Sequence, residues 1–307
     1  MICVLNFALP RLLPGNPVAY LTGMDEATLT DEKIQFYEDA LHINEPIRRQ
    51  FGFYVGTLLD GSLGYSYKKE CTVSELIGER LGNTMQICLS AALISAALGL
   101  VLGLSAGYKN GKAIERVQTG AQIVLNAFPT FLIALVLVIL LCFKGRIFPY
   151  SGLGGGEGLS GFFDRIRHLF LPVLTLVIAQ TPSRYLAVKN AAANALGEKY
   201  VLYARQRGLS ARAIKYSYIL KSIAPPYIAM IGTGIGGCLG GSVVVESIFS
   251  VNGMGRLLSD AVYTLDYPLM QGVLFTTALI MVAAIILTDI VCILLDPRTL
   301  AGGSHEE

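Results

Sequence analysis

Cysteine and histidine are the side chains here best suited to metal binding, redox chemistry or nucleophilic catalysis, and their spacing argues against all three. The six cysteines form no C-x-x-C pair, and most lie inside apolar runs, as expected of small side chains packed between helices. The three histidines form no H-E-x-x-H motif or ligand cluster, and no nucleophile–base pair is evident. We therefore expect no catalytic residue, no metal site and no bound cofactor. The residues concerned are Cys3, Cys71, Cys88, Cys142, Cys238, Cys292, His42, His168 and His305.

The composition indicates a membrane protein. Hydrophobic residues make up 53% of the 307 residues and charged residues only 15%, against about 25% in a typical soluble domain. So little charge cannot cover a water-facing surface. The net charge of +2 gives no field strong enough to suggest nucleic-acid binding. We expect an all-α polytopic membrane protein, because helices satisfy their own backbone hydrogen bonds in lipid.

Five stretches are apolar enough and long enough to cross the hydrocarbon, which takes about 20 helical residues. They are 81–108, 117–143, 169–188, 222–245 and 267–288. Arg184 lies within the third of these stretches, and its long side chain is expected to snorkel toward the membrane surface. Residues 1–13 are too short for a full crossing, and we expect them to be the outer part of a first helix whose beginning is missing.

The distribution of basic residues predicts the orientation of the chain. Residues 109–116 and 184–221 hold eleven Lys and Arg residues, counting Arg184 with the second segment. The alternate segments between the spans hold five. We therefore expect the first pair, and the C-terminal tail 300–307, to be cytoplasmic. Residues 14–80 are then extracytoplasmic, with helical patterns over 30–41 and from Pro46 onward. The second pattern is amphipathic and either packs on the helix bundle, which we favour, or lies at the membrane interface.

Glycines and prolines concentrate in the predicted spans. Close helix packing or a backbone-lined path would explain the glycines, and kinked helices would explain the prolines. Helix-bundle geometry alone is the interpretation that we favour. The residues are Gly232, Gly234, Gly236, Gly237, Gly240, Gly241, Pro129, Pro172 and Pro182.

The most informative segment is the basic stretch 195–216, ALGEKYVLYARQRGLSARAIKY, between two spans. Its apolar residues fit one face of a helix, Gly208 interrupts the pattern, and Ser210 is suited to cap a second short helix. Such a helix–Gly–helix segment is either a solvated connector or a docking element. The patterned apolar face favours docking.

This segment resembles the EAA loop of ABC-transporter permease subunits, whose pattern reads roughly E-x-Y-[VI]-x-x-A-x-x-x-G-L-S. Other runs resemble the peptide/nickel branch of that family, in order along nearly the whole chain. They are LLPGNPV (12–18), INEPI (43–47), GSLGYS (61–66), FPYSGLG (148–154), GGSVVVESIFSVNGMGRLLSDAV (240–262), DYPLMQG (266–272) and LLDPR (294–298). The resemblance implies a six-helix importer permease fold, with its first helix clipped, a membrane core over 81–299 and a coupling loop over 190–217.

In this family the EAA loop forms a short coupling helix that docks into a groove of a separate ATPase. The present sequence has no G-x-x-x-x-G-K-[ST] phosphate loop, in agreement with ATP–Mg being bound by partner subunits and with this chain not being an enzyme. Ala204 is expected to permit close approach of the ATPase, and Gly208 to supply a turn that a side chain would obstruct. Tyr200 and Leu209 would make apolar contacts with the ATPase, and Arg205 and Arg207 would pair with acidic groups at the rim of its groove. The expected coupling residues are Glu198, Tyr200, Ala204, Arg205, Arg207, Gly208, Leu209 and Ser210.

By the same resemblance, residues 246–267 form an extracytoplasmic gate that contacts a substrate-binding protein. The expected gate residues are Glu246, Phe249, Gly253, Gly255, Arg256, Asp266 and Tyr267.

Asp289 is an acidic residue inside the last predicted span. A charge at mid-helix costs about 2.5–3.5 kcal/mol on insertion scales, so we expect Asp289 to face protein rather than lipid. A proton or ion site is one interpretation. We favour a structural polar contact near the cytoplasmic end, because no second acidic residue or histidine in a span could form a relay.

The favoured function is the permease subunit of an ATP-driven ABC importer of short peptides, in the cytoplasmic (inner) membrane of a prokaryote. The expected partners are a second, homologous permease in a heterodimer, two ABC ATPase subunits and an extracytoplasmic substrate-binding protein. Import of nickel or a nickel chelate is the alternative in the same class, because such permeases share most of these motifs. An ATP-independent secondary transporter is the alternative in a different class; it predicts paired charges within the spans, and only Asp289 qualifies.

Overall fold

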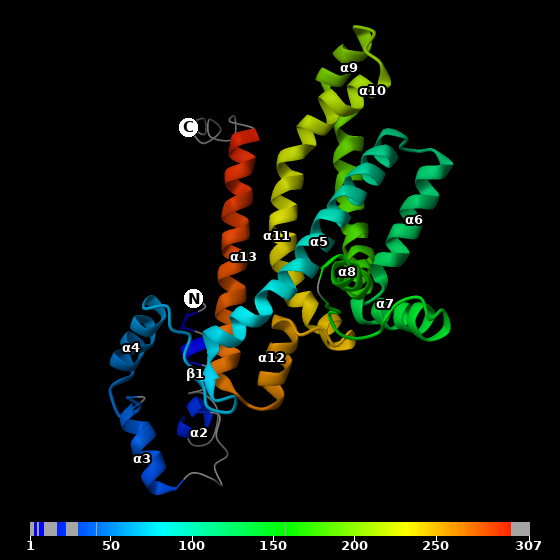
Figure 1. The fold of residues 1–307 in the computed structure, drawn as a ribbon. Helices are drawn as coiled ribbons and strands as arrows, with labels where there is room; N and C mark the ends of the chain where they lie inside the picture. Colours follow the sequence, from blue (N-terminus) through cyan, green and yellow to red (C-terminus); the bar gives the residue numbers. More distant parts are fainter. Residues whose placement is uncertain are drawn as a thin grey trace, which may run out of the picture. The chain divides into compact units, whose positions relative to one another are not determined.

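The computed structural model describes residues 3, 4, 6–8, 17–22, 30–40, 42–156 and 158–295, and most of these residues are helical (Figure 1). The chain divides into two compact units. The first unit comprises Met1–Met85 and Val251–Ile280, and the second comprises Gln86–Ser250 and Met281–Glu307. Two long helices, α5 (Val73–Tyr108) and α13 (Tyr267–Leu295), begin in the first unit and continue in the second.

Two of the predicted segments lie largely or wholly outside the described residues. Only residues 3, 4 and 6–8 of the expected partial first helix, 1–13, are described. The expected cytoplasmic tail 300–307 falls outside them altogether, as does the DPR part of the 294–298 run.

The first unit contains short helices and one small hairpin. Its elements are α2 (Pro17–Thr22), α3 (Asp31–Ala40), α4 (Ile47–Leu59), β1 (Tyr65–Ser66), β2 (Cys71–Thr72) and α12 (Met254–Tyr263). Both helical patterns predicted within 14–80 are confirmed, since α3 and α4 occupy them. The core of this unit is formed by apolar side chains from the start of α5, from α12 and from the start of α13, with Val73, Leu257 and Leu269 fully buried.

The second unit is a bundle of longer helices. It contains α6 (Ala113–Ala127), α7 (Thr130–Leu137), the π-helix η2 (Val138–Lys144), α8 (Gly158–Ala195), α9 (Lys199–Gln206), α10 (Ala211–Ala213), the π-helix η3 (Ile214–Ile219) and α11 (Leu220–Ile248). The central element is α8, which packs against α6, α7 and α11.

Within the described residues, three helices are long and apolar enough to cross a membrane. They are α5, the stretch Ala211–Gly240 and the stretch Tyr267–Leu294 of α13. A fourth span results if α6 and the following α7–η2 are counted together. The predicted span 169–188 lies inside α8, which is not among these candidates, so that crossing stays a prediction.

The predicted span 117–143 is not one continuous helix. Its two halves, α6 and α7–η2, are bent by 98° relative to each other. A proline disfavours helical backbone in the residue before it. Phe128 is accordingly extended (φ −80°, ψ 127°), and Pro129 (φ −60°, ψ 142°) becomes the N-cap of α7.

Glycines allow α5 to lie directly against α8. Gly99, Gly103 and Gly107 are spaced four residues apart and therefore share one face of α5. A Cβ added to Gly103 would lie 2.7 Å from the carbonyl oxygen of Tyr185, and one added to Gly107 would lie 2.7 Å from that of Lys189. The obstacle at both positions is backbone, which cannot move aside as a side chain does.

A second glycine contact joins α11 to α13 in the same unit. A Cβ on Gly232 would collide with Thr288, and one on Gly236 would collide with Met281. Within the part of the chain that the structure describes, nothing lies within 4 Å of the corresponding positions on Gly237 and Gly240. Only part of the glycine set therefore serves helix packing, as small residues do in membrane bundles.

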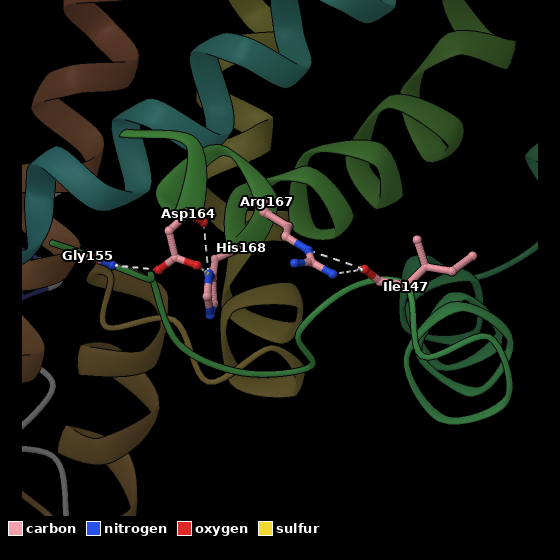
Figure 2. Close-up of polar contacts among 5 residues, drawn as sticks. All are labelled: Ile147, Gly155, Asp164, Arg167 and His168. Carbon is pink, nitrogen blue, oxygen red and sulfur yellow. Dashed lines mark hydrogen bonds and ion pairs between the residues drawn. The ribbon is translucent and has the colours of Figure 1, made fainter. Parts of the chain in front are cut away.

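The segment between η2 and α8 is fixed to the first turns of α8 (Figure 2). Gly155 N–H donates to Asp164 Oδ2 at 3.0 Å, and His168 Nδ1 lies 2.9 Å from the Asp164 carbonyl oxygen. The Arg167 guanidinium donates through Nε and Nη2 to the carbonyl of Ile147. The FPYSGLG run is thereby held between these contacts.

Candidate functional site

The expected coupling segment has the predicted helix–Gly–helix form. It leaves α8, forms α9 and α10, and continues into α11 at one end of the second unit (Figure 1). Glu198 precedes α9 with extended backbone (φ −72°, ψ 146°), and its carbonyl accepts the N–H of Val201 at 3.0 Å. The Glu198 side chain is exposed and makes no capping hydrogen bond within the described residues.

The turn after α9 is a Schellman motif centred on Gly208. The φ of Gly208 is +73°, in the left-handed region that glycine enters without strain. The N–H of Gly208 donates to the carbonyl of Arg205 at 2.9 Å, and the N–H of Leu209 to that of Ala204 at 3.2 Å. Among the described residues, a Cβ on Gly208 would meet nothing within 4 Å. The expected turn at Gly208 is therefore confirmed, and the backbone angle rather than a steric clash is what disfavours a side chain there.

The predicted cap at Ser210 is confirmed. Its Oγ accepts a hydrogen bond from the N–H of Ala213 at 3.2 Å. The helix that starts there does not end as a short element, because α10, η3 and α11 follow one another without a loop from Ala211 to Ile248. No loop therefore separates α10 from the long helix α11.

One face of the coupling segment is built into the core of the second unit. Val201 and Ala204 are 0% and 2% exposed, and Tyr200 and Leu209 pack against the same cluster. That cluster also contains Leu104, Val188, Ala192, Ile214 and Ile219 from α5, α8 and η3. The structure thus places Ala204, Tyr200 and Leu209 against the chain's own core rather than on its surface.

The opposite face is exposed and holds the two predicted arginines. Arg205 and Arg207 are exposed, and so are two apolar residues that the sequence reasoning did not select. These are Leu202, at 48% exposure, and Tyr203, at 63%. Two apolar side chains on the outer face of a short polar helix were the signal that could have identified them.

The coupling segment is flanked by polar ties within the second unit. Lys215 Nζ donates to Ser105 Oγ at 2.8 Å, which joins η3 to α5. Lys189 Nζ lies 2.5 Å from Glu115 Oε1, an ion pair of largely buried groups that joins α8 to α6. These two lysines, counted in the sequence as loop charges, therefore hold helices together.

The expected gate residues are mostly buried inside their own units. Glu246 and Phe249 belong to the second unit and are 0% and 1% exposed. The remaining five belong to the first unit, where only Arg256 is half-buried and Gly253, Gly255, Asp266 and Tyr267 are buried. The exposed residues nearby, Val262, Tyr263 and Leu265, were missed by the sequence reasoning.

Asp266 connects two of the recognised sequence runs. Its Oδ2 accepts a hydrogen bond from Ser66 Oγ of the GSLGYS run, 200 residues away, and its Oδ1 accepts the N–H of Leu269 at 3.2 Å. The second contact caps α13, because Asp266 immediately precedes that helix. Gly272 completes the arrangement, since a Cβ there would collide with Val73. Asp266 is therefore a buried structural residue of the first unit.

We expect Asp266→Ala to destabilise the protein by about 1–3 kcal/mol, because it removes a helix cap and leaves Ser66 without its acceptor. The thermal unfolding midpoint of the purified protein in detergent measures this effect. Asp266→Asn keeps an oxygen that accepts the Leu269 N–H, and its amide NH2 can donate to Ser66 Oγ, so this variant should lose less than half as much. An unchanged midpoint in the alanine variant would contradict the assignment.

The polar contact expected of Asp289 is not found among the described residues of this chain, and it stays a prediction. Asp289 is exposed on α13, and no hydrogen bond or ion pair of its carboxylate occurs among the described residues. Thr288 and Met281 occupy the face of α13 that meets α11, so Asp289 is turned off that face. The helix contacts of this chain leave the carboxylate pointing outward.

Comparisons with known proteins agree with this fold. A family model described as "Binding-protein-dependent transport system inner membrane component" matches residues 99–301. The "Probable peptide ABC transporter permease protein y4tP" of Sinorhizobium fredii is 28% identical over 97% of this chain and 94% of its own length. The "Oligopeptide transport system permease protein AppB" of Bacillus subtilis is 28% identical over 97% of this chain and 93% of its own. A chain of the inward-facing MetNI methionine ABC transporter superimposes with a TM-score of 0.58 at 13% identity, over 72% of this chain and 96% of that one.

The fold is that of an all-α polytopic membrane protein of the importer permease kind, as the sequence predicted. The chain belongs to the family of binding-protein-dependent transport system inner membrane components, whose model spans about two thirds of it. The resemblance inferred from the sequence motifs is thereby confirmed.

Proposed function

We propose that this chain is the permease subunit of an ABC importer for short peptides. The observation that carries the proposal is that relatives named as peptide and oligopeptide permeases align with 97% of the chain, so that both units are included. Alignment of this extent favours a shared transport function over a shared fold alone.

The coupling segment is proposed to dock onto a separate ATPase through the exposed face of α9. Arg205 and Arg207 would pair with acidic groups there, and Leu202 and Tyr203 would supply apolar contact. Val201 and Ala204 on the opposite face join α9 to the bundle core. Movement of the ATPase would then reach α11 through Gly208, Ser210 and the unbroken helix that follows.

The remaining assembly is proposed from the family and the charge pattern. A second, homologous permease would complete a heterodimer, and two ATPase subunits would bind ATP–Mg. The coupling loop 190–217 and the tail 300–307 would be cytoplasmic, with 14–80 outside and 81–299 forming the membrane core. Val262, Tyr263 and Leu265 would contact the substrate-binding protein.

Reconstitution of the whole importer in liposomes tests the proposal. We expect uptake of labelled di- and tripeptides only when the partner permease, both ATPases, the binding protein and ATP–Mg are present. The chain reconstituted alone should transport nothing. Peptide uptake by the isolated chain would refute the dependence on a partner ATPase, and uptake of nickel without uptake of peptides would refute the substrate class.

A further inference from the structure

An open pocket with both polar and apolar lining lies in the helix bundle of the second unit, among α7, α8 and α11. Its volume is about 360 Å³, within the range of about 300–1,000 Å³ that is usual for small-molecule sites. Its polar lining comes from Thr130, Gln180, Ser183, Arg184 and Thr233. Apolar lining comes from Leu176 and Met230.

Arg184 is the charged residue of this lining, and it does not snorkel. Its side chain is only 3% exposed, so the expectation that it extends to the membrane surface is wrong. The position explains this result, because eleven residues separate Arg184 from the end of α8 at Ala195, a distance of about 17 Å along the helix. An arginine side chain cannot span that distance.

Two glycines make room for the buried guanidinium. A Cβ on Gly99 would lie 2.7 Å from the Cβ of Arg184, and a Cβ on Gly234 would lie 2.8 Å from its Nη2. Nη1 donates to the carbonyl of Ala92 at 2.6 Å and also to Ser95 Oγ. These contacts hold one edge of the guanidinium against α5, while Nη2 points toward the cavity wall at Gly234.

The positive charge of Arg184 has no counter-ion in the described part of the chain. No carboxylate oxygen there lies within 4.0 Å of its guanidinium. A buried charge that is hydrogen-bonded only to neutral groups is uncompensated, and ionisable groups inside membrane bundles usually serve a ligand or a transport path. The free edge of a guanidinium is suited to donate hydrogen bonds to both oxygens of a carboxylate.

We propose that Arg184 binds the C-terminal carboxylate of the transported peptide within this cavity. The proposal rests on the proposed function, peptide import. Peptides of different sequence share only their backbone amides and their two charged termini, so a path for many peptides can rely on few charged groups. A fixed guanidinium recognises the anionic terminus whatever the side chains are.

Uptake of dialanine and of its C-terminal amide by the reconstituted importer tests this assignment. The binding protein is saturated with either peptide, so that its own preference does not limit the rate. We expect the wild-type importer to favour the free carboxylate, and Arg184→Gln to lower dialanine uptake about tenfold, the factor that corresponds to one charged hydrogen bond. Uptake of the amide should change less than about twofold.

Thr233→Val is the matched control, because it removes a hydroxyl from the same cavity while Arg184 stays in place. The Thr233 hydroxyl already donates within its own helix, so the ratio of the two uptake rates should stay as in wild type. Gly234→Ala supplies a second test if Arg184→Gln fails to assemble. Its methyl group displaces the guanidinium but keeps the charge in the protein, and the preference should fall.

The outcomes separate the two proposals. An equal loss of both peptides in Arg184→Gln, or an unchanged ratio in Gly234→Ala when the first variant does not assemble, overturns the carboxylate assignment and leaves peptide import intact. Equal uptake of both peptides by the wild-type importer does the same. A wild-type importer that takes up neither peptide overturns the proposed function, and this inference with it.

Discussion

Replacing Gly208 with valine is expected to reduce substrate-stimulated ATP hydrolysis by the assembled importer at least about tenfold. The left-handed backbone at Gly208 costs an ordinary L-residue about 1–2 kcal/mol, and β-branched residues tolerate it least. A penalty of about 1.4 kcal/mol reduces the population of the native turn about tenfold. Loss of the turn releases Leu209 from Ala204 and changes the direction in which the chain enters α10. Membrane insertion, measured by fractionation and blotting, should stay normal.

Gly208→Asn is the matched control for that variant. Asparagine adds a side chain at the same exposed position but adopts left-handed backbone much more readily. Substantial coupling in Gly208→Asn, together with its loss in Gly208→Val, would establish that the backbone angle is what matters. Loss in both variants would indicate that the ATPase approaches Gly208 too closely for any side chain. Wild-type coupling in the valine variant would contradict the proposed role of this turn.

Gly103→Leu is expected to prevent stable folding of the second unit. Overpacking a protein interior costs about 1–3 kcal/mol, and here the added side chain meets the carbonyl of Tyr185 and the side chain of Val188 with no space to occupy. The loss of stability should therefore reach or exceed the upper end of that range. Size-exclusion chromatography of the detergent-extracted protein and its thermal unfolding midpoint measure the effect.

Gly82→Leu lies on the same helix and controls for the general effect of adding a leucine. A Cβ at Gly82 meets nothing within 4 Å among the described residues, so this variant should fold nearly as well as wild type. Equal stability of the Gly103 and Gly82 variants would show that the close contact between α5 and α8 is not needed.

Features that depend on neighbours in the sequence were predictable. The helix–Gly–helix form of the coupling segment follows from apolar spacing and Gly208, and the cap at Ser210 follows from the residue type and its place before the helix. The helices over 30–41 and after Pro46 follow from the same kind of pattern. The bend at Pro129 could be located, but its size of 98° could not, because that angle depends on packing against α8 and α11.

Features that depend on distant contacts were not predictable. Apolar side chains suit both lipid and the bundle interior, so composition could not show that Gly99, Gly103 and Gly107 face α8. The expectation for Arg184 was wrong for a similar reason. Its burial depends on Gly99 and Gly234 on two other helices, and no local pattern relates those positions to Arg184.

The predicted gate residues show a related limit. The family pattern marked Asp266 without indicating what the carboxylate does. Its partner Ser66 lies 200 residues earlier, and no local pattern relates the two positions. The exposed residues beside it, such as Tyr263, carry no recognisable motif and became visible only from their solvent exposure.

No loop interrupts the chain from Ala211 to Ile248, and a straight α-helix of this length would be about 57 Å long at about 1.5 Å per residue. The π-helix η3, Pro225 and Pro226 lie within it. A tilt of about 5° around the end nearest Gly208 swings the opposite tip by about 5 Å, which is close to one helical turn. If an ATPase docks on the coupling segment as proposed, a modest rotation of that subunit would be amplified along this helical stretch. The displacement at Ile248 depends on the position of the pivot along this helical stretch. Inserting residues between the pivot and Ile248 should therefore increase that displacement.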